Sequence, residues 1–334
     1  MKIHVMKFGG SSLCTPEKIC QAAAKASEKK KNGIFPVLIV SAPADITDDL
    51  IKLASQTAAQ IPPREYDALL SCGEQMSAAL CASALCSSGN AAMSVTGWQA
   101  GILTDSSFKE AGVISVSGEI IKDAVSKNII PVIAGFQGSD DKGNITTLGR
   151  GGSDLTAVLV AQLLEADLCE FYTDVKGIYS AHPALVPEAE VIPLVSYGEI
   201  IALGAKGTAV RQIRAIRYAM EHGLSLRLRS SFLSDEGTVL AAKGRQGINA
   251  LALQKNKNGA AVISAIGYNL SEQDYSFFMS AAKDCGAAAV YKEKDCFSLE
   301  IPEKEAENAL RFMHSSIISN GRQKMACKRI NQIL

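Results

Sequence analysis

Short apolar runs, separated by stretches with helical periodicity, constrain the fold of this chain more than any other feature. Residues 35–42 form an uninterrupted apolar run, which is typical of a strand buried on both faces of a parallel sheet. Similar runs predict strands at 129–136, 168–173 and 224–229, after a first strand at 3–8. This alternation predicts an α/β domain, a three-layer αβα sandwich whose mostly parallel sheet is covered on both faces.

The pattern changes near residue 245, which divides the chain into two predicted domains, 1–245 and 248–334. The second is expected to be a small α+β domain of about ninety residues, long enough to fold separately. Its predicted elements, in order, are a strand at 260–267, a helix at 271–285, strands at 287–291 and 296–301, a helix at 303–315 and a weak final strand.

Composition excludes several classes of protein. Lys plus Arg equals Asp plus Glu at 34 each among 334 residues, so nothing resembles the basic stripe of a nucleic-acid binder. The nine cysteines form no CxxC pair, which favours free thiols over a disulfide framework or a zinc site. The N-terminus lacks a secretory h-region, and no apolar stretch is expected to be long enough to span a bilayer. We therefore expect a cytoplasmic protein.

A helix is predicted to follow the first strand. Thr15 is its expected N-cap and Pro16 its first residue, a common start signal. The lysine run at 29–31 ends this helix, where cations complement the helix dipole. We expect the run to be a solvated helix end.

The stretch TTLGRGGSDLTAV, residues 146–158, combines glycines with an arginine and an aspartate before an apolar run. Gly149, Gly151 and Gly152 allow left-handed backbone and close approach. Ser153 is the predicted N-cap of the following helix. The helix N-terminus and the planar fork of Arg150 suit an anion. An ordinary glycine turn that opens a helix is the alternative.

A second glycine turn, KFGGSS at 7–12, ends the first predicted strand. Ligands of open α/β sheets bind outside the carboxyl ends of the strands. The turn matches neither the P-loop nor the GxGxxG spacing, yet its lysine, hydroxyls and backbone N–H groups suit a phosphoryl group. One turn is thus predicted to hold a phosphate chain and the other a carboxylate, although a purely structural turn is the alternative.

These motifs, with others in order along residues 1–240, resemble the aspartokinase branch of the amino-acid kinase family. The resemblance is carried by KFGGSS (7–12), VSAPADITDDL (40–50), SCGEQMSA (71–78), TGWQAGILTD (96–105), GFQG (135–138), TTLGRGGSD (146–154), EFYTDVKGIYSAHP (170–183) and RLRSSF (227–232). It implies the amino-acid kinase fold, followed by a single ACT-like, ferredoxin-like domain that serves regulation or dimerisation.

The resemblance also implies an activity, transfer of the γ-phosphoryl of ATP, with Mg²⁺, to the side-chain carboxylate of L-aspartate. This reaction is the entry to lysine, threonine and methionine synthesis. Lys7 and Asp154 would be catalytic, with Asp154 organising Lys7 or the magnesium. The amino acid would be held by Thr47, Glu74, Arg150, Gly151, Gly152 and Ser153. The nucleotide would be held by Lys7, Phe8, Gly9, Gly10, Ser11, Thr173, Asp174, Tyr179, Lys206 and Gly207.

Three segments depart from the family pattern. His182 and Ala184 stand where the family has aspartate and arginine, so a cationic donor to the nucleotide is missing, and Arg211 or Arg214 is expected to compensate in part. The segment GAKGTAV (204–210) keeps Lys206 but alters the loop after it. Pro43 and Ala44 replace residues of a turn that usually holds two glycines.

Two other functions are alternatives. One is a kinase of the same fold that acts on another acceptor, such as glutamate, a carbamate or a nucleoside monophosphate. The other is a weakly active or non-catalytic regulatory homologue, which the missing arginine and the short C-terminal region favour. We expect small-molecule substrates, no nucleic acid or membrane partner, and a homodimer or higher homo-oligomer through the ACT-like domain.

Overall fold

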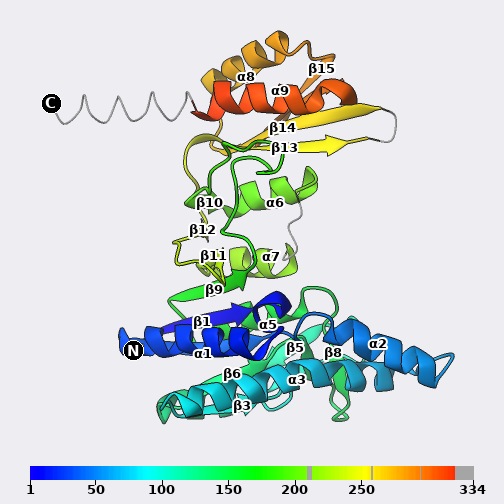
Figure 1. The fold of residues 1–334 in the computed structure, drawn as a ribbon, viewed down its shortest axis with the longest axis vertical. Coiled ribbons are helices and arrows are strands. Elements are labelled where there is room, and N and C mark those ends of the chain that lie inside the picture. The colour runs from blue at the N-terminus through cyan, green and yellow to red at the C-terminus, as the bar shows by residue number, and fades with distance from the viewer. Residues whose placement is uncertain (209–212, 257–258, 294, 320–334) are drawn as a thin grey trace. The chain divides into compact units, whose positions relative to one another are not determined.

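A computed structural model describes residues 1–208, 213–256, 259–293 and 295–319 (Figure 1). The chain groups into two compact units. The first unit comprises Met1–Lys176 with Arg214–Glu236, and the second comprises Gly177–Ile213 with Gly237–Leu334. Residues 177–213 therefore group with the C-terminal part, although they precede the predicted domain boundary near residue 245, which stays a prediction.

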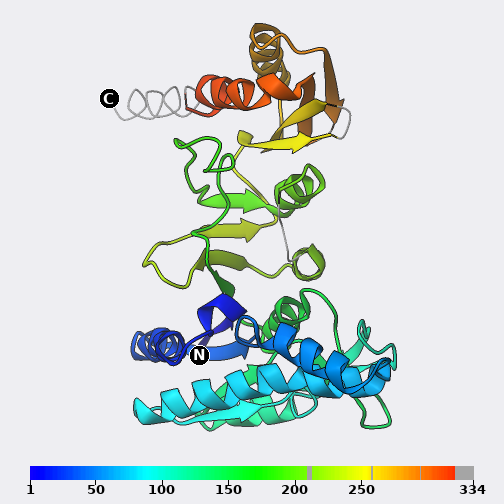
Figure 2. The ribbon, with the colours of Figure 1, turned by 45° about the vertical axis from the view of Figure 1, so that its right-hand side comes forward.

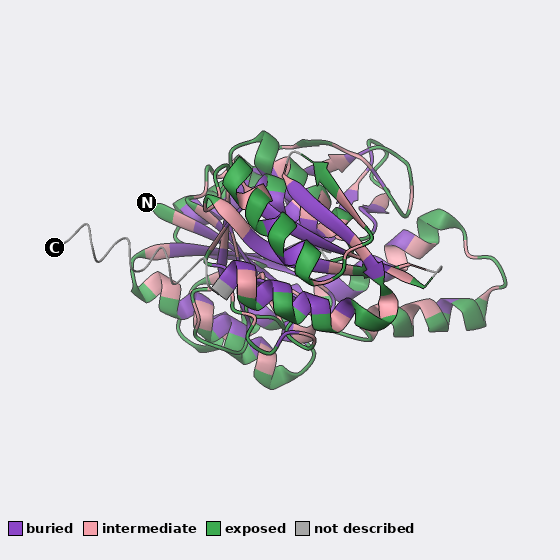
Figure 3. Cartoon of the chain, turned by 90° about the horizontal axis from the view of Figure 1, so that it is seen from above, coloured by how far each residue is buried: buried purple, intermediate pink, exposed green. Residues whose placement is uncertain are grey.

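The first unit is built on parallel strands in the order β11-β9-β1-β2-β6-β3. The predicted α/β class with a mostly parallel sheet is confirmed, because each predicted run forms a strand here. The central strands β1, β2 and β6 are almost fully buried, which matches their continuous apolar sequences; Figure 3 colours the whole chain by burial. Their bounds are β1 (Lys2–Phe8), β2 (Ile34–Val40), β3 (Ala92–Val95), β6 (Ile130–Ala134), β9 (Leu168–Thr173) and β11 (Leu226–Ser230).

Helices cover both faces of this sheet. α1 (Pro16–Lys31) and α3 (Pro63–Ser87) run side by side and pack on β2 (Figure 1). α5 (Gly152–Leu163) packs on β1 and β9 from the opposite face, because alternate residues of a strand point to opposite sides. α2 (Ile46–Thr57), α4 (Glu119–Ser126) and α7 (Ile213–Glu221) complete the helices of this unit. The predicted start of α1 is confirmed, since the Thr15 side chain accepts a hydrogen bond from the Lys18 backbone N–H.

A small sheet in the first unit has the strand order β5-β4-β7-β8. Its strands are β4 (Ile102–Thr104), β5 (Val113–Val116), β7 (Gln137–Ser139) and β8 (Ile145–Thr147). Strand β8 leads directly into the glycine turn before α5, so this sheet carries one of the two predicted anion-binding turns.

The second unit contains β10 (Leu194–Ser196) paired in parallel with β12 (Thr238–Ala241), α6 (Tyr197–Ala205), and an antiparallel sheet in the order β13-β14-β16-β15 (Figure 2). Phe278, Phe297 and Leu310 are in the hydrophobic core under that sheet. Its elements are β13 (Gly247–Lys255), β14 (Ala260–Tyr268), α8 (Glu272–Asp284), β15 (Ala289–Glu293), β16 (Cys296–Pro302) and α9 (Ala306–Met313).

The predicted order of this C-terminal part needs one correction. Strand β13 was not predicted, because asparagine and glutamine dilute its apolar residues, yet it pairs along its length with β14. The weak final strand that we predicted lies outside the described residues.

The lysine run ends α1 as predicted, and Lys31 is exposed, but Lys29 contacts a buried acid and is not a solvated helix end. Lys29 Nζ lies 2.7 Å from the buried Glu170 carboxylate, which also pairs with Arg229 at 3.1 Å. Burial alone would raise the pKa of Glu170, but hydrogen bonds from His4 and Lys29 and their charges lower it to about 2. This buried ion cluster joins α1 to the face of the sheet opposite α5.

The prediction that no apolar stretch is long enough to span a bilayer was also wrong. Helix α3 is long and apolar enough by length and composition, and half of that apolar window is buried inside the structure. Asp67 and Glu74 lie on its buried side, and α3 packs on α1, β3 and β6. These contacts are those of a core helix in the first unit.

Gly73 lets α3 approach the loop after β2, because a Cβ at this position would lie 2.7 Å from the Ala42 Cβ. We expect Gly73→Ala to lower the free energy of unfolding by about 1–3 kcal/mol through overpacking. The matched control is Gly198→Ala in α6, where the nearest atom would be 3.9 Å away. There, alanine should raise stability by up to about 1 kcal/mol. Urea unfolding of both variants checks this, and equal effects would contradict it.

Candidate active site

Lys7 occupies the carboxyl end of β1 and points toward α5. Its Nζ lies 2.8 Å from Oδ1 of Asp154, in the first turn of α5. Lys7 is 9% exposed and Asp154 is 6% exposed, so water screens this ion pair little. The pair is one of the two arrangements that we expected for Asp154, and it places a buried ammonium group at the carboxyl edge of the sheet.

The turn after β1 is tight and is packed against the loop after β2. Residues Gly10–Ser12 form a short 3-10 helix, and the Gly10 carbonyl accepts a hydrogen bond from Ala44 N at 3.1 Å. A Cβ on Gly10 would lie 2.7 Å from the Ala42 carbonyl oxygen. Gly9 N–H donates to the Tyr172 carbonyl, which fixes the start of the turn to the end of β9.

Glu74 is a buried acid on α3. Its Oε1 accepts a hydrogen bond from Ala42 N at 3.0 Å, whereas its buried Oε2 has no hydrogen-bond partner among the described residues. Burial raises the pKa of Glu74 to about 7, against the opposing effects of the Ala42 N–H and the Lys7 charge. A buried carboxylate with an unused oxygen and a shifted pKa is a candidate binding group for a cation.

The turn before α5 has the expected left-handed backbone, with φ of 73° at Gly149 and 75° at Gly151. Gly151 is the N-cap of α5, so the prediction that Ser153 caps this helix was wrong. Ser153 lies one residue inside the helix, because the left-handed Gly151 ends the turn two residues earlier than expected. Arg150 is exposed and precedes the helix N-terminus, where backbone N–H groups suit an anion.

Sequence reasoning missed the role of Arg214 at this turn and missed Asp67 altogether. Arg214 of α7 donates from its NH1 to the Leu148 carbonyl at 2.7 Å. Asp67 of α3, fully buried, accepts hydrogen bonds from Thr147 and Lys109. The sequence did contain a signal for Asp67. It lies seven residues before Glu74, which places both acids on the same, buried side of one helix.

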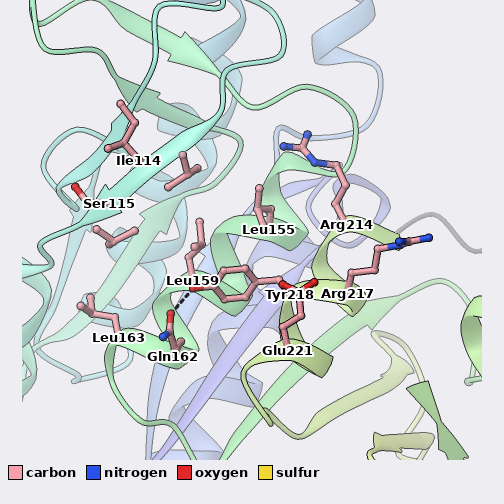
Figure 4. Close-up of a pocket in the computed structure, with 12 residues that line it drawn as sticks. Ile114, Ser115, Leu155, Leu159, Gln162, Leu163, Arg214, Arg217, Tyr218 and Glu221 are labelled. Atoms are coloured by element: carbon pink, nitrogen blue, oxygen red, sulfur yellow. Dashed lines mark hydrogen bonds between the residues drawn. The ribbon is translucent and has the colours of Figure 1, made fainter. Parts of the chain in front are cut away.

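A cleft of about 630 Å³ lies between β5, α5 and α7 in the first unit. Figure 4 shows Tyr218 pointing from α7 toward Gln162, to which its hydroxyl donates a hydrogen bond. Arg214 lines the cleft, but none of the predicted site residues do. The cleft is therefore separate from the predicted catalytic residues.

The residues predicted to bind nucleotide fall into both units. Thr173 ends β9 and Asp174 follows it in the first unit, and the Thr173 hydroxyl accepts a hydrogen bond from Val175 N. Tyr179, Lys206 and Gly207 belong to the second unit. There Lys206 forms an ion pair with Glu293 of β15. The first unit thus contains all residues predicted to bind the amino acid, but only some of those predicted to bind the nucleotide.

The departures from the family pattern have clear local structures. His182 and Ala184 lie on an exposed loop, where Ala184 N donates to Nδ1 of His182 at 3.3 Å. Arg214 is engaged by Leu148, and Arg211 lies outside the described residues. Asp45 adopts a left-handed backbone with φ of 74° as the N-cap of α2, in the turn where the family usually has glycine. Thr47 is half-buried in the first turn of that helix.

No group of three or more His, Cys, Asp or Glu side chains that could hold a metal ion occurs in the described part of the chain. Mg²⁺ usually keeps several waters and takes one or two carboxylates together with substrate phosphates. A magnesium ion bound mainly by nucleotide phosphates would not require such a group.

Comparisons with known proteins place these features in context. The model of the amino acid kinase family matches residues 2–230. An aspartokinase from Bacillus sp. (strain MGA3) is 44% identical over 240 residues, which are 72% of this chain and 58% of that protein. An aspartate kinase from Stutzerimonas stutzeri is 39% identical over 272 residues, 81% of this chain and 64% of that protein. The chain thus spans less than two thirds of these relatives.

Solved structures share the fold. The crystal structure of E. coli aspartokinase III in complex with aspartate and ADP is similar with a TM-score of 0.77, at 19% identity. The match covers 95% of this chain and 100% of that chain. The similarity shows a common fold for the described elements.

The raised pKa of Glu74 makes stability depend on pH. Because its folded-state pKa of about 7 exceeds the ordinary 4.5, its contribution is complete below about pH 4.5 and is lost as pH rises through 7. We expect the unfolding free energy of the native chain, relative to Glu74→Gln, to fall by up to about 3 kcal/mol over that range.

Urea unfolding at several pH values measures this difference. Glu65→Gln, an exposed acid on the same helix, is the control and should follow the native pH profile. Superimposable profiles for the native chain and Glu74→Gln would contradict the shift.

Proposed function

Since this chain belongs to the amino acid kinase family, we propose that it transfers the γ-phosphoryl group of ATP to the side-chain carboxylate of L-aspartate, forming 4-phospho-L-aspartate and ADP. The observation that carries the proposal is the buried Glu74 with its unpartnered oxygen, in the same unit as the exposed Arg150. An amino acid carries an ammonium and a carboxylate group, which an acid and an arginine can bind respectively. The aspartokinase relatives support the same substrate.

Arg150 would bind the α-carboxylate of aspartate through a bidentate pair. The first residues of α5, Gly152 and Ser153, together with Gly151, would add the helix N-terminus to that site. Glu74 would bind the α-ammonium group through its free Oε2, and Thr47 would contact the rest of the amino acid. Binding the ammonium would favour the ionised form of Glu74, so aspartate would bind with release of a proton near neutral pH.

The chemistry requires little proton transfer. A side-chain oxygen of aspartate, already ionised, attacks the γ-phosphorus, and the bond to the β,γ-bridging oxygen breaks as ADP leaves. Lys7 would stabilise the negative charge on the transferring group, because such reactions depend mainly on positioning and charge neutralisation. Asp154 would orient the Lys7 ammonium through the ion pair at 2.8 Å.

ATP would be bound by the residues predicted for the nucleotide. We propose that the backbone and side chains of the β1 turn contact its phosphates, with the remaining contacts made by residues at the end of β9 and around α6. These residues are Phe8, Gly9, Gly10, Ser11, Thr173, Asp174, Tyr179, Lys206 and Gly207. Magnesium, bound to the phosphates, would neutralise charge during transfer.

Location and partners complete the proposal. The protein would act in the cytoplasm, at the entry to lysine, threonine and methionine synthesis, with aspartate and ATP as its substrates. The antiparallel sheet and helices of residues 248–334 would form a single ACT-like domain, through which copies of the chain associate.

A weakly active or regulatory homologue is the second candidate. The observation that favours it is the ion pair between Lys206 and Glu293, because it occupies a lysine proposed to bind nucleotide in a chain that also has Ala184 in place of an arginine. Aspartate binding without turnover would distinguish this candidate from an active kinase.

Arg150 provides the first test of the function. The full chain is assayed with ATP, Mg²⁺ and L-aspartate, and hydroxylamine traps the acyl phosphate as the hydroxamate. We expect Arg150→Gln to raise the KM for aspartate about ten- to a hundredfold, because a charge-assisted contact is worth about 1.5–3 kcal/mol. Arg217→Gln, another exposed arginine, should leave KM unchanged. An active chain that is insensitive to Arg150→Gln would contradict the assigned role.

Lys7 provides a second test. Lys7→Met should lower kcat about a hundred- to a thousandfold, since it removes a preorganised charge from the transition state. It also leaves Asp154 buried and unpaired, so the double variant Lys7→Met/Asp154→Leu separates folding from catalysis. We expect the double variant to regain thermal stability but no activity. Recovery of activity in the double variant would show that Lys7 is not catalytic.

A further inference from the structure

Asp67 is a fully buried carboxylate on α3 whose hydrogen bonds all extend to segments distant in the sequence. It is 0% exposed. Thr147 N donates to Oδ2 at 2.7 Å and the Thr147 hydroxyl donates to Oδ1 at 3.0 Å. Lys109 N donates to both oxygens, at 2.9 and 3.1 Å. The helix is thereby joined to the end of β8 and to the loop after β4.

The backbone that leads to Arg150 is held at successive groups. The Thr147 carbonyl accepts from Ala111 N at 2.9 Å, and Leu148 N donates to the Phe136 carbonyl at 2.8 Å. The Leu148 carbonyl accepts from Arg214. Because each of these partners comes from a different segment, Arg150 extends from a backbone with little freedom to shift.

Lys109 shows that Asp67 also holds strained backbone. Its φ is 75°, a left-handed conformation that costs free energy for a residue with a Cβ. Such a conformation persists only where the surroundings enforce it. The two Asp67 oxygens bind its N–H, and its Nζ lies 4.8 Å from the centroid of the Tyr66 ring. A Cβ on Gly149 would lie 3.1 Å from the Lys109 carbonyl oxygen, so this strained loop packs against the turn beside Arg150.

Helix α3 connects both ends of the proposed amino-acid site. Glu74 lies two helical turns after Asp67, about 10 Å along the axis. One rigid helix therefore carries the acid proposed to bind the α-ammonium group and the acid that anchors the turn of Arg150.

We propose that Asp67 is a positioning residue for aspartate, which fixes Arg150 relative to Glu74 by anchoring the backbone at Thr147 and Lys109. The proposal rests on the proposed function, in which Arg150 and Glu74 bind the two ends of the amino acid. Asp67 thereby contributes to specificity for α-amino acids, because α3 sets the distance between Arg150 and Glu74, the groups proposed to bind the α-carboxylate and the α-ammonium.

The test compares Asp67→Asn in the full chain with a matched control. Asparagine keeps one acceptor oxygen and replaces the other by a donor. We expect the KM for aspartate to rise about ten- to a hundredfold, because small misplacements of a binding group have effects of this size. The KM for ATP should stay within about twofold. In the free protein, amide hydrogen exchange at Lys109 and Thr147 should become faster. Glu170→Gln, which weakens a buried carboxylate cluster between α1 and β9, should lower thermal stability but leave the KM for aspartate unchanged.

A smaller change tests the same contact if Asp67→Asn does not fold. Thr147→Val removes one hydroxyl donor and should raise the KM for aspartate a few-fold, whereas Thr147→Ser should retain the native value. Equal changes of KM for aspartate and ATP, or the same change in Glu170→Gln, would reduce Asp67 to a structural residue and overturn the proposal. An unchanged KM for aspartate with faster exchange would overturn it as well.

Failure of the proposed function is recognised separately. If the native chain forms no hydroxamate, calorimetric titration with L-aspartate replaces KM by Kd for the same variants. Loss of aspartate affinity in Asp67→Asn alone then supports the positioning role in a non-catalytic chain. No binding of aspartate by the native chain would overturn both proposals, and exchange at Lys109 and Thr147 would still report whether Asp67 anchors the two loops.

Discussion

The buried ion pair between Lys7 and Asp154 is the interaction on which the candidate site depends, because it joins the end of β1 to the first turn of α5. Each charge is nearly excluded from water, so removal of one partner leaves a buried charge uncompensated, at about 3–5 kcal/mol. The pair also connects the two glycine turns, since one follows Lys7 and the other precedes Asp154. A group that would neutralise a transferring phosphoryl is thereby held at the start of the helix that would bind the amino acid.

Helix α3 contributes a second constraint through its buried acids. An apolar core helix with two buried carboxylates is costly unless each is satisfied. Asp67 accepts four hydrogen bonds from the end of β8 and the loop after β4, which makes it a structural anchor. Glu74 has one oxygen satisfied and one buried without a partner, which leaves it suited to a ligand. Of the two acids, Asp67 therefore holds the backbone of the candidate site, whereas Glu74 is available to bind a ligand.

The residues proposed to bind the nucleotide differ in part from the family pattern. Lys206 pairs with Glu293 of the antiparallel sheet within the second unit, and Ala184 N donates to the ring of His182 on an exposed loop. A surface ion pair contributes about 0–1 kcal/mol, so Glu293 holds Lys206 only weakly.

The sequence by itself determined the parallel strands, the start of α1, the left-handed glycines before α5 and the family, because apolar runs, cap residues and glycine motifs are local signals. Three features became clear only from the structure: the N-cap of α5, strand β13 and the burial of α3. Each is set by packing, through the exact position of a turn, the pairing with β14, or the contacts of α3 with its neighbours. Asp67 and Thr147 are 80 residues apart, and Lys206 and Glu293 are 87 apart. No local periodicity encodes such contacts, so only the tertiary structure decided which acids anchor, which pair and which is left open to a ligand.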